Sequence, residues 1–186
     1  MRDDITILLG TVGTGMWRST NGGQTWARPK GTRDKMPWSE LIIFSLTRHP
    51  KDPQVIFAGT QDGLYRSDDK GASFEKVDSE MNDYDVWSVA IDPSDPDTMF
   101  AGCRPGAIFR SKNGGQDWLQ MNAEFAEHCD NINIPRVLTM AVDPTDSRVV
   151  WAGVEVDGVR RSLDGGDTWH TIGAAVTPGE VGTSLD

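Results

Sequence analysis

An eight-residue motif that begins with serine and ends with an aromatic residue occurs four times in this chain of 186 residues. The copies begin at Ser19, Ser67, Ser111 and Ser162, at intervals of 48, 44 and 51 residues. A repeat of this period indicates an architecture of successive similar units, and it outweighs local secondary-structure propensity. The motif therefore constrains the fold more than any other feature of the sequence.

Each copy is preceded by short segments of β-strand composition in the same order. A segment closing on glycine comes first, over Ile7–Gly10, Ile56–Gly59, Met99–Gly102 and Val150–Gly153. A segment closing on arginine follows, over Met16–Arg18, Leu64–Arg66, Ile108–Arg110 and Val159–Arg161. Three units also begin with a further strand that ends at a proline turn, over Ile43–Pro50, Val86–Pro93 and Val137–Pro144. Four short strands per unit predict the four-stranded antiparallel blade of a β-propeller.

The residues of the motif suit a tight turn. The Asn or Asp at its third position can accept hydrogen bonds from backbone N–H groups, and the glycine at its fifth position supplies a positive φ. We expect the serine to join this network and the aromatic ring to be buried between sheets. The positions with this structural role are Ser19, Asn21, Gly23 and Trp26; Ser67, Asp69, Gly71 and Phe74; Ser111, Asn113, Gly115 and Trp118; and Ser162, Asp164, Gly166 and Trp169.

The repeated motif resembles the Asp box, or BNR repeat, of the sialidase and sortilin-like superfamily. The resemblance covers residues 5–172 and implies an all-β propeller, with units at about 5–37, 38–81, 82–133 and 134–173 and a tail over 174–186. These form a single domain or a fragment of one. In such propellers the boxes lie away from the functional face, so the resemblance specifies the fold and leaves the function open.

The first unit begins at its second strand, which predicts three whole blades and one partial blade. An open ring would expose sheet faces and edges that proteins ordinarily cover. Three arrangements would close it: a longer chain of which this is a fragment, self-association of two copies, or a tight ring of four blades.

Composition excludes some classes of partner. The net charge of −10 repels nucleic acid and anionic lipid, and Leu41–Leu46, the longest apolar run, is too short to span a membrane. No secretory signal begins the chain, so we expect a cytoplasmic protein or a mature secreted form. Cys103 and Cys129 allow one disulfide at most, with free thiols as the expectation, and no residues have metal-ligand spacing. We expect no cofactor.

Positions that vary in polarity between units are the candidates for a ligand site. Ile42, Asp85 and Arg136 share a slot at the entry to the innermost strand, and the loops after the second strands vary likewise. Segment 119–135 is the longest connector. We expect an acidic loop with a short helix over 123–128, and the alternative is a cluster of carboxylate and imidazole groups that does acid or base chemistry beside Arg136. The candidate ligand-binding residues are Arg104, Arg136, Gln61, Asp62, Trp38, Glu127 and His128.

Two aromatic residues near the entries to inner strands, Trp38 and Trp87, have rings that could stack on sugar faces. Trp87, however, shares a slot with Phe44 and Leu138, which favours core packing for this residue.

Two functions are compatible with these residues. The leading hypothesis is a non-enzymatic binding module that presents loops to a protein or glycan ligand, because the structural boxes are complete and no catalytic set is. The alternative is a glycoside hydrolase-like propeller, because the strand over 86–93 resembles strands of hydrolases that act on β-glucans. Such an enzyme requires two carboxylates that face each other. Asp85 with Glu155 or Asp157 is the candidate pair. A sialidase is disfavoured, because its Arg-Ile-Pro sequence appears only as Ile134-Pro135-Arg136, in another order and place.

Overall fold

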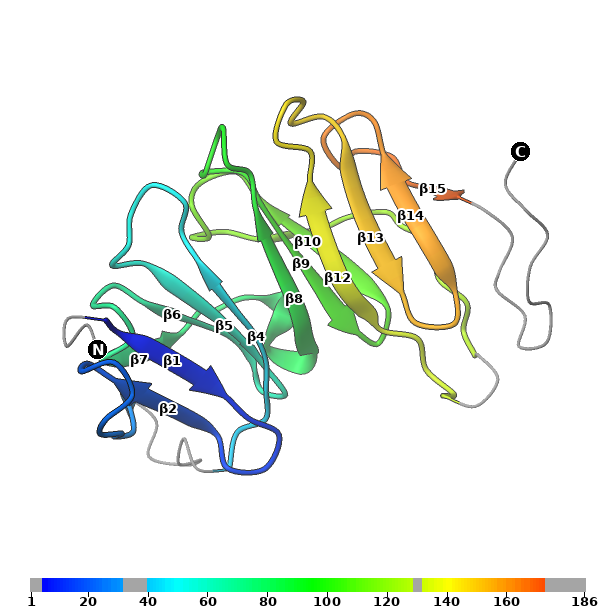
Figure 1. The fold of residues 1–186 in the computed structure, drawn as a ribbon. Coiled ribbons are helices and arrows are strands. Elements are labelled where there is room, and N and C mark those ends of the chain that lie inside the picture. Colours follow the sequence, from blue (N-terminus) through cyan, green and yellow to red (C-terminus); the bar gives the residue numbers. More distant parts are fainter. Residues whose placement is uncertain (1–4, 32–39, 129–131, 173–186) are drawn as a thin grey trace, which may run out of the picture.

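The computed structural model describes residues 5–31, 40–128 and 132–172, whose strands form four successive blades (Figure 1). Blade 1 contains β1 (Ile7–Gly10) and β2 (Met16–Ser19). Blade 2 contains β4 (Ile43–Arg48), β5 (Ile56–Thr60), β6 (Gly63–Ser67) and β7 (Ser73–Lys76), with β3 (Lys30–Gly31) at its edge. Blade 3 contains β8 (Asp85–Ile91), β9 (Met99–Arg104), β10 (Ala107–Ser111) and β11 (Leu119–Gln120). Blade 4 contains β12 (Val137–Val142), β13 (Val150–Val154), β14 (Gly158–Ser162) and β15 (His170–Ile172).

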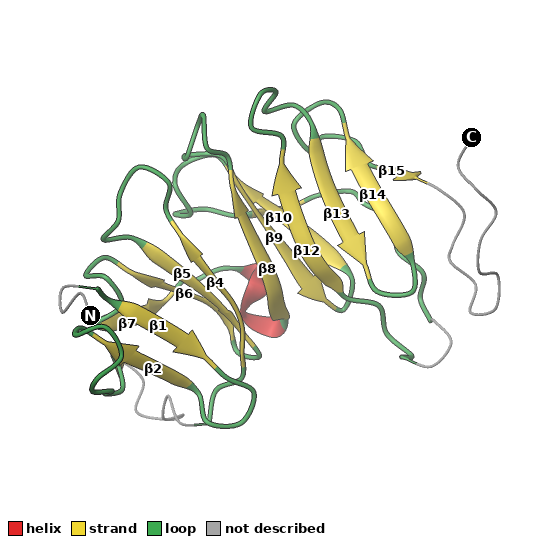
Figure 2. Ribbon diagram, viewed as in Figure 1, coloured by secondary structure: helices red, strands yellow, loops and turns green. Residues whose placement is uncertain are grey.

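The blades are sheets whose consecutive strands pair antiparallel, and they fan out side by side (Figures 1 and 2). The first strands β4, β8 and β12 lie next to one another, which makes them the innermost strands of the arc. The predicted all-β propeller with four-stranded antiparallel blades is confirmed. Blades 1 and 4 lie at opposite ends of the arc, so the described residues do not form the tight ring of four blades (Figure 1).

One bulge interrupts each innermost strand. The register of β4, β8 and β12 against β5, β9 and β13 shifts after the first pairs of residues. The residues skipped by these shifts are Phe44, Trp87 and Leu138. A bulge takes a residue out of the ladder and re-aims its side chain. The three bulges therefore give one side chain per blade a direction different from that of its strand neighbours.

Blade 1 is joined to blade 2 by a short parallel pair that the sequence did not predict. β3 runs parallel to β7 and places Lys30 opposite Ser73. The N–H of Lys30 donates to the carbonyl oxygen of Ala72 at 2.8 Å. The segment leaving blade 1 thus extends the outer edge of the next sheet.

The core consists of three apolar clusters, one at each junction between neighbouring blades. Phe57 and Phe100, on the second strands of blades 2 and 3, are 1% and 0% exposed. Gly115 and Gly166 of the following blades sit against these rings, where a Cβ atom would approach them to 3.1 and 2.6 Å. Glycine is thus needed for close approach as well as for its φ of 83° and 91°. Cys103 is a buried free thiol, and Cys129 lies outside the described residues.

The predicted short helix over residues 123–128 is wrong. Residues 121–128 have no helical structure, and the backbone groups of Glu124 and Ala126 bond to side chains of blade 4. Arg160 donates to the carbonyl oxygen of Glu124 at 3.0 Å, and the N–H of Ala126 donates to Asp157 at 2.9 Å. Among the described residues the helical structure is a single 3₁₀ turn, η1 (Glu80–Asp83).

Candidate functional site

The four boxes form the same locked turn, which joins the third strand of each blade to its outer edge. In each box the serine Oγ accepts from the N–H of the fifth residue at 2.8 to 2.9 Å and donates to the third residue at 2.7 to 3.0 Å. The side-chain oxygen of the third residue accepts from the N–H of the seventh at 2.8 to 2.9 Å. All of these bonds stay within the turn, which gives the boxes a structural role.

The box aromatics differ in burial. Phe74 and Trp118 are 1% and 9% exposed, and Trp169 is half-buried. Trp26 is 40% exposed, so the expectation of a buried ring is wrong for the first box. Blade 1 has no preceding blade among the described residues, and this leaves its aromatic ring uncovered.

Two bulged residues and one arginine form a row at the inner side of the arc, which we call the axial row: Phe44 on β4, Trp87 on β8 and Arg136 directly before β12. The rings of Phe44 and Trp87 stack with centroids 4.0 Å apart and an interplanar angle of 17°. The guanidinium carbon of Arg136 lies 4.4 Å from the centroid of Trp87. Two groups this close cannot share one face of the indole, so Trp87 is held between them. The row crosses three blades.

The expectation that Trp87 packs in the core is wrong. The residue is half-buried and lies outside the three apolar clusters, and Leu138 in the same slot is 43% exposed. Sequence reasoning missed this because the bulge depends on pairing with the neighbouring strand. The recurrence of a large apolar residue one position after Ile43, Val86 and Val137 is the signal that could have suggested it.

Charged residues flank the axial row. Arg136 forms a salt bridge with Glu155 through two nitrogens, of which Nη2 lies 2.8 Å from Oε1. Oδ2 of Asp85 lies 3.9 Å from Nη1 of Arg104. Burial raises the pKa of the Asp85 carboxyl above its ordinary value, and the charges of Arg104 and Arg136 act in the opposite direction. The structure thus brings four of the predicted site residues, Asp85, Arg104, Arg136 and Glu155, to one end of the inner strands.

The candidates Asp62 and Asp157 occupy one repeat slot, and each accepts a hydrogen bond from the residue three positions later. Asp62 accepts from the hydroxyl of Tyr65 at 2.7 Å and from Lys76 at 3.0 Å. Asp157 accepts from Arg160 at 2.6 Å. The Asp62–Tyr65 and Asp157–Arg160 pairs each join residues three positions apart across the turn between the second and third strands, and so they stabilise that turn. Gln61 lies in the same loop, half-buried, with its N–H bonded to Ile42 at 3.3 Å.

The remaining candidates lie elsewhere. Glu127 and His128 are exposed in the connector to blade 4, where His128 is 3.1 Å from the side chain of Asn133. Trp38 lies outside the described residues. Across residues 5–31, 40–128 and 132–172, no three His, Cys, Asp or Glu side chains gather as metal ligands would. No helix in these ranges has the length and apolarity needed to cross a membrane.

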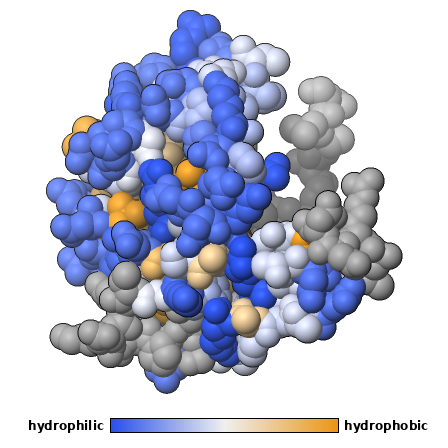
Figure 3. Space-filling model, turned by 90° about the vertical axis from the view of Figure 1, so that its left-hand side faces the viewer, coloured by the Kyte–Doolittle hydropathy of each residue, from blue (hydrophilic) through white to orange (hydrophobic). Residues whose placement is uncertain are grey.

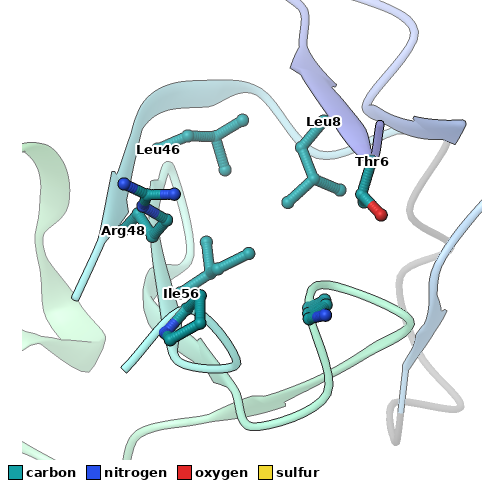
Figure 4. A pocket seen from close by; sticks show the side chains of 7 residues that line it. Thr6, Leu8, Leu46, Arg48 and Ile56 are labelled. Carbon is teal, nitrogen blue, oxygen red and sulfur yellow. The ribbon is translucent and has the colours of Figure 1, made fainter. Parts of the chain in front are cut away.

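A cavity of about 380 Å³ lies away from these residues, between blades 1 and 2 (Figure 4). Leu8, Leu46 and Ile56 line it with aliphatic side chains, and Arg48 lies at its side. At the next two junctions the position of Leu8 is taken by Phe57 and Phe100. At this junction a leucine thus takes the position that an aromatic residue occupies at the other two.

The fold and its four locked turns define a β-propeller of the Asp-box class. Residues 62–184 match the Sortilin-Vps10 family model, described as sortilin, neurotensin receptor 3, and the chain belongs to this family. No curated protein matches the sequence.

Solved structures with the same fold are much longer than this chain. An ancestral GH74 enzyme has a TM-score of 0.75 and 22% identity, covering 94% of this chain and 23% of its own. The extracellular domain of a B. thetaiotaomicron protein assigned as a one-component system has a TM-score of 0.65 and 18% identity, covering 92% of this chain and 21% of its own. YCF48 bound to D1 peptide has a TM-score of 0.52 and 19% identity, covering 77% of this chain and 45% of its own.

Proposed function

We propose that the chain is a non-enzymatic propeller module that binds a polypeptide segment across the axial row. The observation that carries the proposal is the partly exposed stack of Phe44, Trp87 and Arg136, which crosses three blades at the ends of their inner strands. Aromatic and arginine side chains dominate the energetics of protein interfaces. The Arg136–Glu155 and Arg104–Asp85 pairs beside them supply polar groups for the backbone or charged side chains of such a segment.

The geometry favours a polypeptide over a glycan. A sugar ring binds an aromatic side chain by lying on its face, but Phe44 and Arg136 occupy the two faces of Trp87. A glycan would have to displace one of them. The likeness to YCF48, whose structure was solved with a peptide, is a further reason to test peptides first.

Hydrolysis has weaker support. A glycoside hydrolase requires an acid and a second carboxylate facing it. Glu155 is bound to Arg136, and Asp157 to Arg160 and the N–H of Ala126, so both are held by their own neighbours. Of the three catalytic candidates, Asp85 has the longest ion-pair distance and a raised pKa.

Selection of phage-displayed random peptides on the chain, followed by calorimetry with the selected synthetic peptides, tests the proposal. We expect Trp87→Ala to weaken binding roughly tenfold or more, because it removes the centre of the stack. Leu119→Ala is the matched control, since Leu119 is 64% exposed on the outer strand of the same blade. Unchanged binding by Trp87→Ala and by Arg136→Gln, both folded by circular dichroism, would refute it. So would turnover of xyloglucan oligomers that Asp85→Asn abolishes.

A further inference from the structure

Each junction between neighbouring blades contains the same hydrogen bond. The arginine that closes the third strand reaches across to the carbonyl oxygen of the fourth box residue in the next blade. The bonds are Arg18 Nε to Lys70 at 3.0 Å, Arg66 Nη1 to Gly114 at 2.9 Å and Arg110 Nη1 to Gly165 at 2.7 Å. Three occurrences in one chain make this bond a general feature of how one blade joins the next.

Two apolar contacts accompany it. A side chain from the second strand lies against the fifth box residue of the next blade, in the pairs Leu8–Gly71, Phe57–Gly115 and Phe100–Gly166. A side chain from the third strand is completely buried at the same junction, as Met16, Leu64 and Ile108 show at 0% exposure. A junction therefore requires an arginine and two apolar side chains on one blade, and a box turn on the next.

Blade 4 presents the first half of such a junction, which we call the trailing face: Trp151, Val159 and Arg161. Trp151 is 36% exposed where Phe57 and Phe100 are buried, and Val159 is 38% exposed. Arg161 lies over the ring of Trp151 at 5.3 Å. Its Nε atom is buried and has no hydrogen-bond partner within the described part of the chain. A buried donor without an acceptor is costly, and the other three junctions show which acceptor fits.

Blade 1 presents the second half, which we call the leading face: Leu9, Gly22, Gly23 and Trp26. Gly22 occupies the slot of the three carbonyl acceptors, and Gly23 has the φ of +90° shared by the glycines that cover aromatic rings. Leu9 is 50% exposed, although alanines in its slot, such as Ala58 and Ala101, are 0% exposed. Figure 3 looks onto this end of the molecule and shows apolar residues at the surface among hydrophilic ones.

We propose that the trailing face of one copy binds the leading face of a second copy as a further blade-to-blade junction, in addition to the three within each copy. Arg161 donates to the carbonyl oxygen of Gly22 of the second copy, and Trp151 lies under its Gly23. The two faces stand at opposite ends of the arc, so they cannot meet within one copy (Figure 1). The contact is head-to-tail and joins different surfaces, so that association either closes a ring or continues as a filament.

Sedimentation equilibrium of the chain between about 1 and 100 μM tests the proposal. We expect dimers or larger species, and at least tenfold weaker association for Arg161→Ala. Arg148→Ala is the control, because Arg148 is an exposed arginine of the same blade that pairs with Asp146. We expect Gln24→Asp to tighten association, because it would place a carboxylate near Arg161 of the other copy. Asp167, the sixth residue of its box as Gln24 is of the first, pairs in this way with Arg110 at 2.6 Å. A chain that stays monomeric over this range overturns the proposal.

Mixing two variants tests the head-to-tail geometry. Trp151→Asp disrupts the trailing face and Leu9→Asp the leading face, and both side chains are exposed, so each variant should fold. We expect each alone to be monomeric and the mixture to form heterodimers through the one intact pair of faces. Heterodimers that do not form, or association of either variant alone at the wild-type concentration, overturn the geometry.

Discussion

At the scale of single residues, the third and seventh positions of each box are matched as a donor and an acceptor. Asp69 and Asp164 accept from the hydroxyl groups of Ser73 and Thr168, both at 2.6 Å. Asn21 instead donates its amide to the hydroxyl of Thr25 at 2.9 Å. Threonine at the seventh position can serve either partner, because its hydroxyl both donates and accepts. The turn therefore tolerates Asp or Asn without changing its shape.

This matching predicts how acid affects the fourth box. Hydrogen bonds from the side chain and the N–H of Thr168 lower the pKa of Asp164 to about 2. A lowered folded-state pKa means that the ionised carboxylate stabilises the fold fully above its ordinary pKa, and that this stabilisation is lost as the pH falls toward 2. Asp164→Asn, which reproduces the pairing of Asn21 with Thr25, should make urea unfolding less sensitive to a shift from pH 7 to pH 2.5.

The third box supplies the control, because Asn113 there donates to the carboxylate of Asp117 at 2.8 Å. Asn113→Asp sets two carboxylates side by side, so it should destabilise the chain at pH 7 and less so at low pH. An Asp164→Asn variant with the full acid sensitivity of the wild type would contradict the argument.

At the scale of strands and turns, the sequence predicted what is local and missed what depends on pairing. The strands from Ile56, Met99 and Val150 and the turns from the four serines appear where the repeat placed them, since each is specified by its own residues. The bulges at Phe44 and Trp87 exist only in register with the next strand, and β3 exists only beside β7. The helix expected over 123–128 is absent, and backbone groups of this segment instead bond to the side chains of Arg160 and Asp157.

The same distinction applies to the candidate site. Comparison of the units drew attention to the inner-strand entries and the loops after the second strands, and the structure places Asp85, Arg104 and Arg136 there. It could not distinguish Glu155, which pairs with an arginine from the neighbouring strand, from Asp157, which braces its own hairpin. Those pairings depend on three-dimensional neighbours.

The cavity between blades 1 and 2 yields a prediction at this scale. Leu8→Phe places an aromatic ring where Phe57 and Phe100 stand at the other junctions, and the cavity of about 380 Å³ has room for the added atoms. Filling a cavity with apolar atoms commonly stabilises a protein by about 1 kcal/mol. Urea denaturation should show a higher midpoint with an unchanged slope.

Val12→Phe is the matched control for this variant, because it adds a ring at a position that is 78% exposed and should leave the midpoint near that of the wild type. If Leu8→Phe lowered the midpoint, the cavity would not accommodate the added ring.

At the scale of the whole molecule, the arc behaves as a one-dimensional array in which each blade is stabilised mainly by its neighbours. Blades 2 and 3 contribute to junctions on both sides, whereas blades 1 and 4 contribute to one each. In such arrays stability is the sum of unit and junction terms, and the ends open before the middle. The arc therefore has a gradient of stability along the chain.

Hydrogen exchange measured by mass spectrometry should reveal this gradient. Amides of β5 and β9 should exchange only at the global free energy of unfolding, whereas those of β1, β2 and β14 should exchange through smaller openings of the end blades. Arg110→Ala, which removes the bonds to Gly165 and Asp167, should speed exchange in blade 4 and leave blade 1 unchanged. Lys112→Ala, an exposed residue of the same blade, is the control. Uniform protection across the four blades would mean that the chain unfolds as one cooperative unit, and the junctions would then not be the separable contacts that their repetition indicates.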